Sequence, residues 1–418
     1  MGFSSLGLHS EFVQTLKDKG YESPTAVQQA AIPVILKGLD VMAGAQTGTG
    51  KTAAFALPIL QQLWEKNSVE GESGNIRPVQ ALVLTPTREL AQQVHRSFKT
   101  YAKHSSLKSV AVYGGVSLKP QIDALKTGAD ILVATPGRLL DLMQKRSVNL
   151  SALKHLVFDE ADRMLDLGFI IDIQRIMKKI PADRQTLLFS ATFTDEIFTL
   201  SKTLLKKPEL IEVDARNTAA ERVEQAVYMV DEDRKRELLS YMIGSKNWQQ
   251  VLVFVRTKEG ADILAKEMIK DGIKALAIHG DKSQGARERG LAEFKEGKVR
   301  ALVATDVAAR GLDIQQLQYV VNYELPYIAE DYIHRIGRTG RAGNEGLAVS
   351  FMSLGEEYLL EEIEVVLDNR LSQSWYPGFE PDMTREVPSN RKNSRNAQKR
   401  RFKDRASGKK TGNHRRSS

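Results

Sequence analysis

The chain has 418 residues, of which 42% are apolar and 27% are charged, so length and composition predict a soluble globular protein with more than one domain. It contains no cysteine, which excludes disulfides, cysteine-based zinc sites and iron–sulfur clusters. No stretch approaches the roughly 20 apolar residues that cross a bilayer. The first residues lack the features of a signal peptide, and we therefore expect a cytoplasmic protein that does not bind membranes.

The net charge of +8 is unevenly distributed. Residues 389–418 hold twelve Lys or Arg and one acid, so the preceding 388 residues carry a net charge of −3. Because the end of the chain has few apolar residues, we predict a disordered basic tail over 376–418. Such a tail is either a solvated, solubilising segment or an electrostatic arm for nucleic acid phosphates.

Strand-like and helix-like segments alternate through the first half of the chain. This rhythm predicts an α/β fold, with a parallel sheet that has helices on both faces. The predicted strands are 40–44, 81–84, 110–113, 131–134, 156–158 and 186–189, and the predicted helical segments include 53–57, 88–102 and 165–180.

A phosphate-binding loop begins at Ala45, directly after the first predicted strand. The sequence Ala-Gln-Thr-Gly-Thr-Gly-Lys-Thr has the form G-x-x-x-x-G-K-[ST] with alanine in the first glycine position. Gly48 and Gly50 allow backbone N–H groups to face phosphate oxygens. Lys51 is expected to reach the β and γ phosphates, and Thr52 to ligate Mg²⁺. The alternative is a structural glycine turn, which the strand before the loop and the helix after it disfavour.

Two carboxylates follow another apolar strand, at Asp159 and Glu160. Such a strand delivers them to the carboxyl edge of a parallel sheet, where open α/β sheets bind ligands. Asp159 is expected to hold Mg²⁺, and Glu160 to orient the attacking water. Asp162 has either a functional contact or the ordinary role of a helix-capping or ion-paired acid. Together with the phosphate loop, the pair predicts a nucleoside triphosphatase.

The second half of the chain repeats the first at a fixed spacing. Residues 81–89 resemble 251–259, and the sequence Leu-Val-Ala-Thr occurs at 132–135 and again at 302–305, in both cases 170 residues apart. Matches this short arise by chance, but two at the same spacing on predicted strands favour a duplicated α/β domain. The phosphate loop and the acidic pair occur only in the first copy.

A second charged motif lies near the end of the second copy, where His-Arg-Ile-Gly-Arg-Thr-Gly-Arg begins at His334. Arg338 and Arg341 suit arginine fingers that stabilise the charge developing on a γ-phosphoryl group. The alternative is a basic patch that faces nucleic acid phosphates. Gln28 precedes the phosphate loop, and a glutamine amide can pair with adenine through two hydrogen bonds.

Taken together, these segments resemble the motifs of the DEAD-box RNA helicases, in order, from residue 1 to about 370. The matching segments are 20–28 with Phe3 upstream, 45–52, 86–91, 114–115, 135–138, 159–162 and 190–192, followed by 253–254, 284–287, 304–313 and 334–341. Residues 247–254 and 282–287 are most similar to the bacterial RhlE-type subgroup.

The resemblance implies two tandem RecA-like domains with ATP in the cleft between them and RNA across both. The implied divisions are a Q-motif region at 1–29, a first domain at 30–208, a linker at 209–222 and a second domain at 223–375. Glu160, Lys51, Arg338 and Arg341 would be catalytic, and Thr52 and Asp159 would hold Mg²⁺. The remaining ATP contacts would be Phe3, Tyr21, Gln28, Ala45, Gln46, Thr47, Gly48, Thr49, Gly50 and Asp313.

The resemblance also implies RNA contacts and residues that couple hydrolysis to unwinding. The RNA contacts would be Pro86, Thr87, Arg88, Gly114, Gly115, Thr135, Pro136, Gly137, Arg138, Arg287 and Thr305. The coupling residues would be Asp162, Ser190, Thr192, Gln284 and His334.

The implied function is an RNA helicase that couples RNA-stimulated ATP hydrolysis to local unwinding of short duplexes or to remodelling of RNA–protein complexes. Its partners would be single-stranded RNA, short duplexes, and ribosomal or RNA-decay assemblies. An ATP-dependent RNA clamp that separates no strands, and a DNA helicase of the same superfamily, remain alternatives. A GTPase is disfavoured because no segment resembles a guanine-reading motif.

Overall fold

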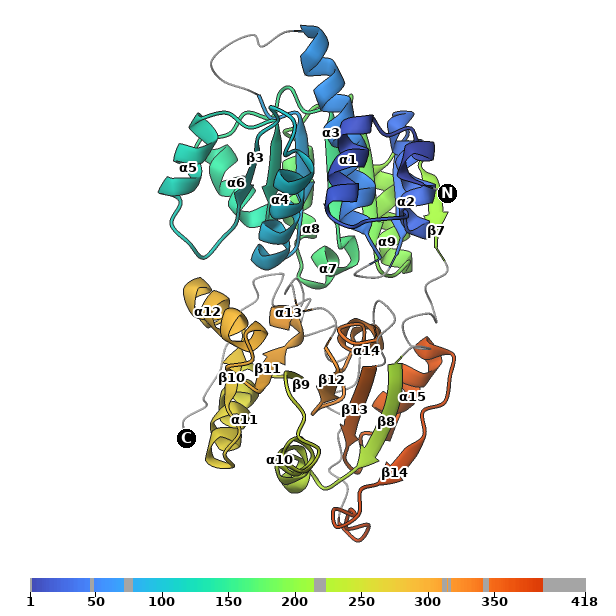
Figure 1. The fold of residues 1–418 in the computed structure, drawn as a ribbon, viewed down its shortest axis with the longest axis vertical. Coiled ribbons are helices and arrows are strands. Elements are labelled where there is room, and N and C mark those ends of the chain that lie inside the picture. Colours follow the sequence, from blue (N-terminus) through green and yellow to red (C-terminus); the bar gives the residue numbers. More distant parts are fainter. Residues whose placement is uncertain are drawn as a thin grey trace, which may run out of the picture. The chain divides into compact units, whose positions relative to one another are not determined.

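The computed structural model describes residues 2–45, 49–70, 78–213, 223–309, 314, 317–340 and 346–385. The chain divides into two compact units, each centred on one seven-stranded sheet (Figure 1). The six strand pairings of the first sheet and five strand pairings of the second are parallel, as the alternation of strands and helices predicts. None of the helices in these ranges is both long and apolar enough to cross a membrane.

The first sheet has the strand order β3-β4-β2-β5-β6-β1-β7. Its strands are β1 (Val41–Gly44), β2 (Ala81–Leu84), β3 (Ser109–Val112), β4 (Ile131–Ala134), β5 (His155–Asp159), β6 (Gln185–Ser190) and β7 (Glu209–Glu212). The helices of this unit are η1 (Phe3–Leu6), α1 (Ser10–Asp18), α2 (Ala26–Leu36), α3 (Lys51–Glu70), α4 (Arg88–Tyr101), α5 (Lys119–Lys126), α6 (Pro136–Gln144), α7 (Ala161–Asp166), α8 (Ile170–Met177) and α9 (Asp195–Leu204).

Alternate residues of each strand in the first sheet face opposite cores, because successive side chains of a strand point to opposite sides. In β2, Ala81 and Val83 belong to the core that α1, α2, α3 and α4 cover. Leu82 and Leu84 belong to the core on the other face, with residues of α6, α7, α8 and α9. The inner strands are therefore buried on both faces, which explains why they read as continuous apolar runs, whereas the edge strand β7 is largely exposed.

The second sheet has the strand order β10-β11-β9-β12-β13-β8-β14. Its strands are β8 (Val223–Met229), β9 (Val251–Val255), β10 (Ala275–Ile278), β11 (Ala301–Thr305), β12 (Tyr319–Asn322), β13 (Gly346–Met352) and β14 (Gln373–Trp375). The helices along this part of the chain are η2 (Glu232–Arg234), α10 (Lys235–Ser245), α11 (Lys258–Lys270), α12 (Gln284–Lys295), α13 (Asp306–Ala309), α14 (Ala329–Ile336) and α15 (Glu357–Leu367).

The two sheets have the same strand order, strand for strand, when β8 is matched with β1 and so on along the chain. The pairing register is also repeated: Leu82 of β2 pairs with Leu132 of β4, and Leu252 of β9 pairs with Leu302 of β11. The sequence matches that are 170 residues apart therefore lie at equivalent places in the two sheets. The prediction of a duplicated α/β domain is confirmed.

Three boundaries predicted from the sequence differ from those in the structure: the helix at 165–180, the start of the linker and the start of the tail. The helix predicted over 165–180 is wrong, because α7 and α8 are separate helices and Gly168, with a φ of 77°, lies between them. The linker predicted at 209–222 begins inside the first sheet, since β7 pairs with β1. Residues 214–222 lie outside the described residues.

The predicted tail also begins too early. Residues 376–385 pack against the second unit, where the ring of Tyr376 lies 5.3 Å from that of Tyr228 and Phe379 is buried. Arg385 ends this stretch with an ion pair to Asp233 (2.8 Å). The strongly basic segment 389–418 lies outside the described residues.

Candidate active site and RNA interface of the first unit

The predicted ligand residues of the first unit gather at the carboxyl ends of its strands, and the strand order divides them into two groups. Strands β5, β6 and β1 are neighbours, and they lead into the acidic motif, residues 190–192 and the phosphate loop. Strands β3, β4 and β2 are also neighbours, and they lead into the three segments predicted to contact RNA. One edge of one sheet therefore carries both predicted functions, side by side.

The phosphate loop joins β1 to the first turn of α3. The Ala45 backbone N–H donates to the carbonyl of Ser190 (3.0 Å), which fixes the start of the loop against β6. Lys51 is buried, and its Nζ donates to the carbonyl of Ala45 (2.7 Å), so the ammonium group lies across the loop that is predicted to hold phosphate. Thr52 follows in α3. Gln46, Thr47 and Gly48 lie outside the described residues.

Gln28 is linked to the phosphate loop by hydrogen bonds within the chain. Its Oε1 accepts the backbone N–H of Thr25 (2.9 Å), which caps α2, and its Nε2 donates to the carbonyl of Gly50 (3.1 Å). Gly50 has a φ of +90°, and a Cβ there would collide with the Gln28 amide nitrogen, so the contact requires glycine. The predicted contact of Gln28 with adenine would therefore act on a side chain that already touches the phosphate loop.

The two aromatic residues predicted to lie near adenine have different surroundings. Phe3 is 5% exposed and belongs to the core between the sheet and its helices. Tyr21 is 48% exposed, between α1 and α2. Tyr21 is thus accessible to a ligand, whereas Phe3 would have little surface to offer without local movement.

Asp159 and Glu160 are buried carboxylates at the end of β5. Oδ1 of Asp159 and Oε2 of Glu160 are buried and have no hydrogen-bond partner among the described residues. Burial raises the pKa of Asp159 to about 7, although the nearby Lys51 acts in the opposite direction. Glu160 has a φ of 55° and a ψ of 56°, the left-handed region, which is strained for a residue other than glycine.

These carboxylates fit a bound Mg²⁺ ion, as the donor set and its electrostatics show. The buried Asp159 carboxylate has one oxygen without a hydrogen-bond partner and a raised pKa, and a nearby divalent cation would stabilise its ionised form. Among the described residues no three His, Asp or Glu side chains cluster as a metal cage. Proteins usually hold Mg²⁺ through one or two carboxylates together with substrate phosphates and water.

Asp162 joins the acidic motif to the turn after β6. Its Oδ2 accepts the backbone N–H groups of Ala191 (3.0 Å) and Thr192 (3.2 Å) and the Thr192 hydroxyl (3.2 Å). The hydroxyl of Ser190 donates to the carbonyl of Thr192 (2.8 Å), which closes the turn after β6. The acidic motif and residues 190–192 therefore form one hydrogen-bonded unit next to the phosphate loop.

The predicted RNA contacts of the first unit also lie together. Arg88, at the start of α4 beyond Pro86 and Thr87, reaches the loop after β3, and a Cβ on Gly115 (φ +75°) would collide with its Nη1. Gly114 lies in the same loop. Gly115 therefore leaves room for the Arg88 guanidinium beside this loop.

The third of these segments is Thr135-Pro136-Gly137-Arg138, where α6 begins with Pro136 in its first turn. Arg138 donates through Nη2 to the carbonyl of Val116 (2.9 Å), in the loop that follows β3. Its Nη1 has no hydrogen-bond partner among the described residues. An unpartnered guanidinium nitrogen next to a helix N-terminus suits a phosphate group.

The site residues predicted in the second half of the chain also lie at the carboxyl ends of strands or in the segments that follow them. Thr305 ends β11, His334 lies in α14, and Arg338 follows that helix directly. Gln284 and Arg287 lie in the first turn of α12, between β10 and β11. Asp313 and Arg341 lie outside the described residues.

Sequence reasoning missed two residues of the second unit, Asp306 and Arg335. The Arg335 guanidinium forms a bidentate ion pair with Asp306 (2.6 and 2.8 Å). Both residues lie inside segments that resemble family motifs, but only their neighbours there were given roles from the sequence: Thr305, Asp313, His334, Arg338 and Arg341. The available signal was the position of Asp306, directly after a strand that ends at the sheet's carboxyl edge.

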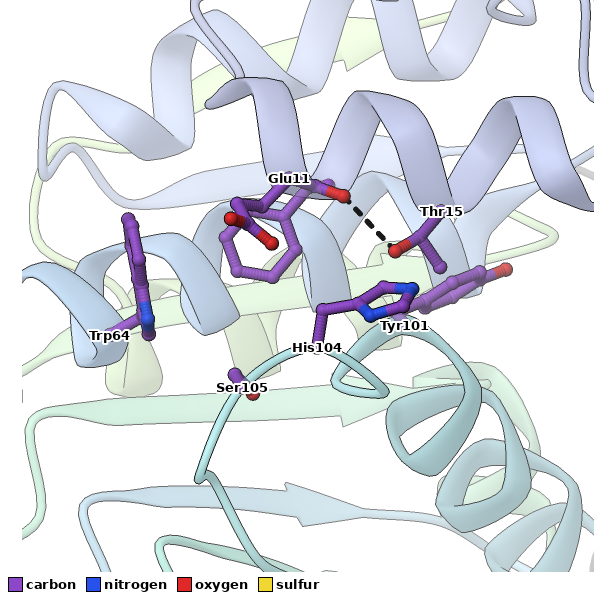
Figure 2. Close-up of a pocket in the computed structure, with 7 residues that line it drawn as sticks. Glu11, Thr15, Trp64, Tyr101, His104 and Ser105 are labelled. Atoms are coloured by element: carbon purple, nitrogen blue, oxygen red, sulfur yellow. Dashed lines mark hydrogen bonds between the residues drawn. The ribbon is translucent and has the colours of Figure 1, made fainter.

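A hollow on the first unit lies away from these residues (Figure 2). It is lined by Glu11, Phe12, Thr15, Trp64, Tyr101, His104 and Ser105. Trp64 lies well along α3 from Lys51, a separation of about 20 Å at 1.5 Å per residue. The hollow includes none of the predicted ATP or RNA residues, and we assign it no part in the site.

Comparison with known proteins places the chain in a family. Residues 25–200 match the profile of the DEAD/DEAH box helicases, and residues 234–343 match the helicase conserved C-terminal domain. The chain is similar to the ATP-dependent RNA helicase CshA of Listeria monocytogenes, with 42% identity over 378 residues that cover 90% of this chain and 71% of that protein. Similarity to the ATP-dependent RNA helicase RhlB of Pseudomonas syringae is 40% over 374 residues, covering 88% of this chain and 94% of that one.

Among solved structures, the chain is similar to Dbp5 of S. cerevisiae bound to RNA and ADP BeF3. The TM-score is 0.78 and the sequence identity 31%, and the match covers 89% of this chain and 95% of that one. The relatives at 40% identity and above, matched over most of both chains, are named ATP-dependent RNA helicases. The chain therefore belongs to the DEAD-box family of ATP-dependent RNA helicases, which hydrolyse ATP.

Proposed function

We propose that this enzyme couples RNA-stimulated ATP hydrolysis to local unwinding of short RNA duplexes or to remodelling of RNA–protein complexes. The observation that carries the proposal is the division of one sheet edge: β5, β6 and β1 lead into the nucleotide residues, and β3, β4 and β2 lead into the RNA residues. Both sites rest on one rigid sheet, so a ligand at either end acts on the same strands.

In this proposal each carboxylate of the acidic motif has its own task. Asp159, with Thr52, holds Mg²⁺, which supplies positive charge to the phosphates when it is bound. Glu160 orients the water and accepts its proton. Its backbone lies in the strained left-handed region, which persists only where the surrounding structure holds it and is common at active sites.

The remaining nucleotide contacts are assigned to residues of both units. We propose that Lys51 leaves the Ala45 carbonyl for the β and γ phosphates when ATP binds, since both positions are within one loop. Gln28 and Tyr21 would then contact adenine, Asp313 the ribose, and Arg338 with Arg341 the γ-phosphoryl group. Since the fingers and the phosphate loop belong to different units, hydrolysis requires both units together.

Coupling follows from the hydrogen bonds of Asp162. When hydrolysis moves Asp159 or Glu160, Asp162 would move with them and shift residues 190–192. Three hydrogen bonds join Asp162 to this turn and a fourth closes the turn, so the four bonds would change together. ATP and RNA would each favour the same arrangement of the enzyme, so each should raise the affinity of the other. The RNA 2′-hydroxyl is proposed to distinguish RNA from DNA.

Finer assignments complete the proposal. We place the enzyme in the RhlE-type subgroup because of residues 247–254 and 282–287, and a sequence tree over 223–375 that groups it with CshA or RhlB would overturn this. A cytoplasmic location, and work on ribosomal or RNA-decay assemblies, are proposed on the same basis. The basic tail would hold RNA non-specifically, with a log–log salt slope of about −0.7 per phosphate neutralised on single strands.

The first test is ATP turnover with and without single-stranded RNA, with equimolar DNA of the same sequence as control. The Glu160→Gln variant in the same preparation reports any contaminating ATPase. Strong stimulation by RNA alone supports the proposal. Equal stimulation by DNA, or full turnover without nucleic acid, contradicts it. Strand displacement under multiple turnover then separates a helicase from an ATP-dependent RNA clamp.

A further inference from the structure

Helix α14 is held on the second sheet by polar side chains that are buried or largely buried. Arg335 is 1% exposed, and its Nε and Nη2 donate to the two carboxylate oxygens of Asp306 (2.6 and 2.8 Å). Nη1 of the same guanidinium donates to Oδ1 of Asn322 (3.2 Å) and to the carbonyl of Glu324 (2.7 Å). The group also lies over the ring of Phe254, 5.0 Å from its centre.

The hydrogen bonds continue from Asn322 across the sheet. Nδ2 of Asn322 donates to the Ser350 hydroxyl of β13 (3.0 Å), which lies 3.5 Å from the Tyr332 hydroxyl. Tyr332 donates in turn to Oε1 of Gln225 in β8 (3.1 Å). Tyr332 and Arg335 are one helical turn apart, so α14 is anchored at one end to β8 and β13 and at the other to β12 and the end of β11.

Stability alone does not explain this arrangement. A buried ion pair is often no more stabilising than well-packed apolar residues of similar volume, because both charges lose their water. What a bidentate arginine–carboxylate pair adds is orientation, since two parallel hydrogen bonds fix the plane of the guanidinium relative to the carboxylate. The pair therefore sets where α14 lies relative to the end of β11.

The two ends of the ion pair adjoin residues with different proposed functions. Asp306 directly follows Thr305, which is proposed to contact RNA. Arg335 directly follows His334 and is close in sequence to Arg338, the proposed finger. We propose that Asp306 is a positioning residue. When RNA binds at Thr305, Asp306 transmits the effect through Arg335 to α14, the helix that precedes the proposed finger Arg338. The inference rests on the proposed function, because the roles of Thr305 and Arg338 are part of it.

The test removes the carboxylate and then restores one from another strand. Asp306→Asn keeps the size of the side chain but loses the charge that Arg335 faces. Adding Asn322→Asp gives Arg335 a carboxylate from β12, and the Ser350 hydroxyl can donate to it. Each full-length variant is assayed for melting temperature, KM for ATP, and ATP turnover with and without saturating RNA.

For Asp306→Asn we expect the RNA stimulation of turnover to fall by about tenfold or more, within the usual range of coupling between sites. The melting temperature should also fall, and KM for ATP should change little. In the double variant the melting temperature should recover, because Arg335 again has a carboxylate, while RNA stimulation stays low. Tyr332→Phe is the matched control. It removes the hydrogen bond from α14 to Gln225 of β8, so the melting temperature should fall while RNA stimulation of turnover stays at the wild-type level.

Two results would overturn the inference. Asp306→Asn with the wild-type degree of RNA stimulation would show that the ion pair only supports the fold. Recovery of stimulation together with melting temperature in the double variant would show that any carboxylate next to Arg335 suffices. Failure of the proposed function itself looks different, because the wild-type enzyme would then show no stimulation by RNA at all.

Discussion

Replacing Asp159 with asparagine should make the ligand-free protein more stable at high pH. The carboxylate is fully buried, and burial raises its pKa from 3.8 to about 7. A raised pKa in the folded state means that the folded chain binds the proton more tightly than the unfolded chain. The wild-type protein therefore gains stability as the pH falls from about 7 towards 4, and loses it as the pH rises.

The size of the effect follows from the two pKa values. One pKa unit corresponds to about 1.4 kcal/mol, so the ionised carboxylate lowers the free energy of unfolding by about 4 kcal/mol at pH 8. At pH 5 the Asp159 carboxyl is protonated in the folded protein but largely ionised in the unfolded chain. Its burial then lowers the free energy of unfolding by about 2 kcal/mol. Asparagine does not titrate, so it adds no pH dependence at this position. The free energy of unfolding of Asp159→Asn minus that of the wild type, here called the stability gap, should therefore increase by about 2 kcal/mol from pH 5 to pH 8.

The assay is equilibrium urea unfolding of both proteins at the two pH values, with EDTA and without nucleotide. Asp183→Asn is the control, because that carboxylate is 98% exposed and should give a gap that hardly changes with pH. A gap for Asp159→Asn that is the same at both pH values would refute the reasoning. Adding Mg²⁺ and ATP should stabilise the wild type far more than the variant, since ligands that bind only the folded state shift unfolding.

Three further substitutions test the proposed roles. Glu160→Gln should bind ATP and RNA but hydrolyse slowly in a turnover assay, and normal turnover would exclude it as the base. Arg341→Ala should lower RNA-saturated turnover by about 10³ if it is a finger, whereas a loss of only about tenfold would indicate a phosphate-binding patch. Deleting 389–418 should weaken RNA binding at low salt in a salt titration and leave RNA-saturated turnover nearly intact. Equal affinity of the two proteins at every salt concentration would favour a solvated tail.

The sequence predicted most of the strands because buried parallel strands are apolar runs of distinctive length. The strands at 81–84 and 131–134 match β2 and β4, while β3 lies one residue earlier than predicted. The long helix over 165–180 was wrong although Gly168 marked the break. Strand β7 was missed because it is an exposed edge strand, and its two glutamates interrupt the apolar run.

Within the candidate site, sequence could locate residues but not their contacts. The partners of Asp162 are about thirty positions away in the chain, and only the pairing of β5 with β6 brings them together. The same holds for Arg335 and Asp306, which are joined across the second sheet. Local patterns such as a glycine loop or a charged pair are visible in the sequence, whereas hydrogen bonds between distant segments depend on the strand order.

The repeated strand order has a consequence for nucleotide stoichiometry. β8 occupies the place in its sheet that β1 has in the first, so a second phosphate loop would be expected directly after β8. The chain there reads Val230-Asp231-Glu232-Asp233, with no glycine to open the backbone, and its carboxylates pair with Lys235 and Arg385 of the same unit. The second unit thus repeats the strand order of the first without a phosphate loop at this position. We therefore expect the enzyme to bind one ATP per chain.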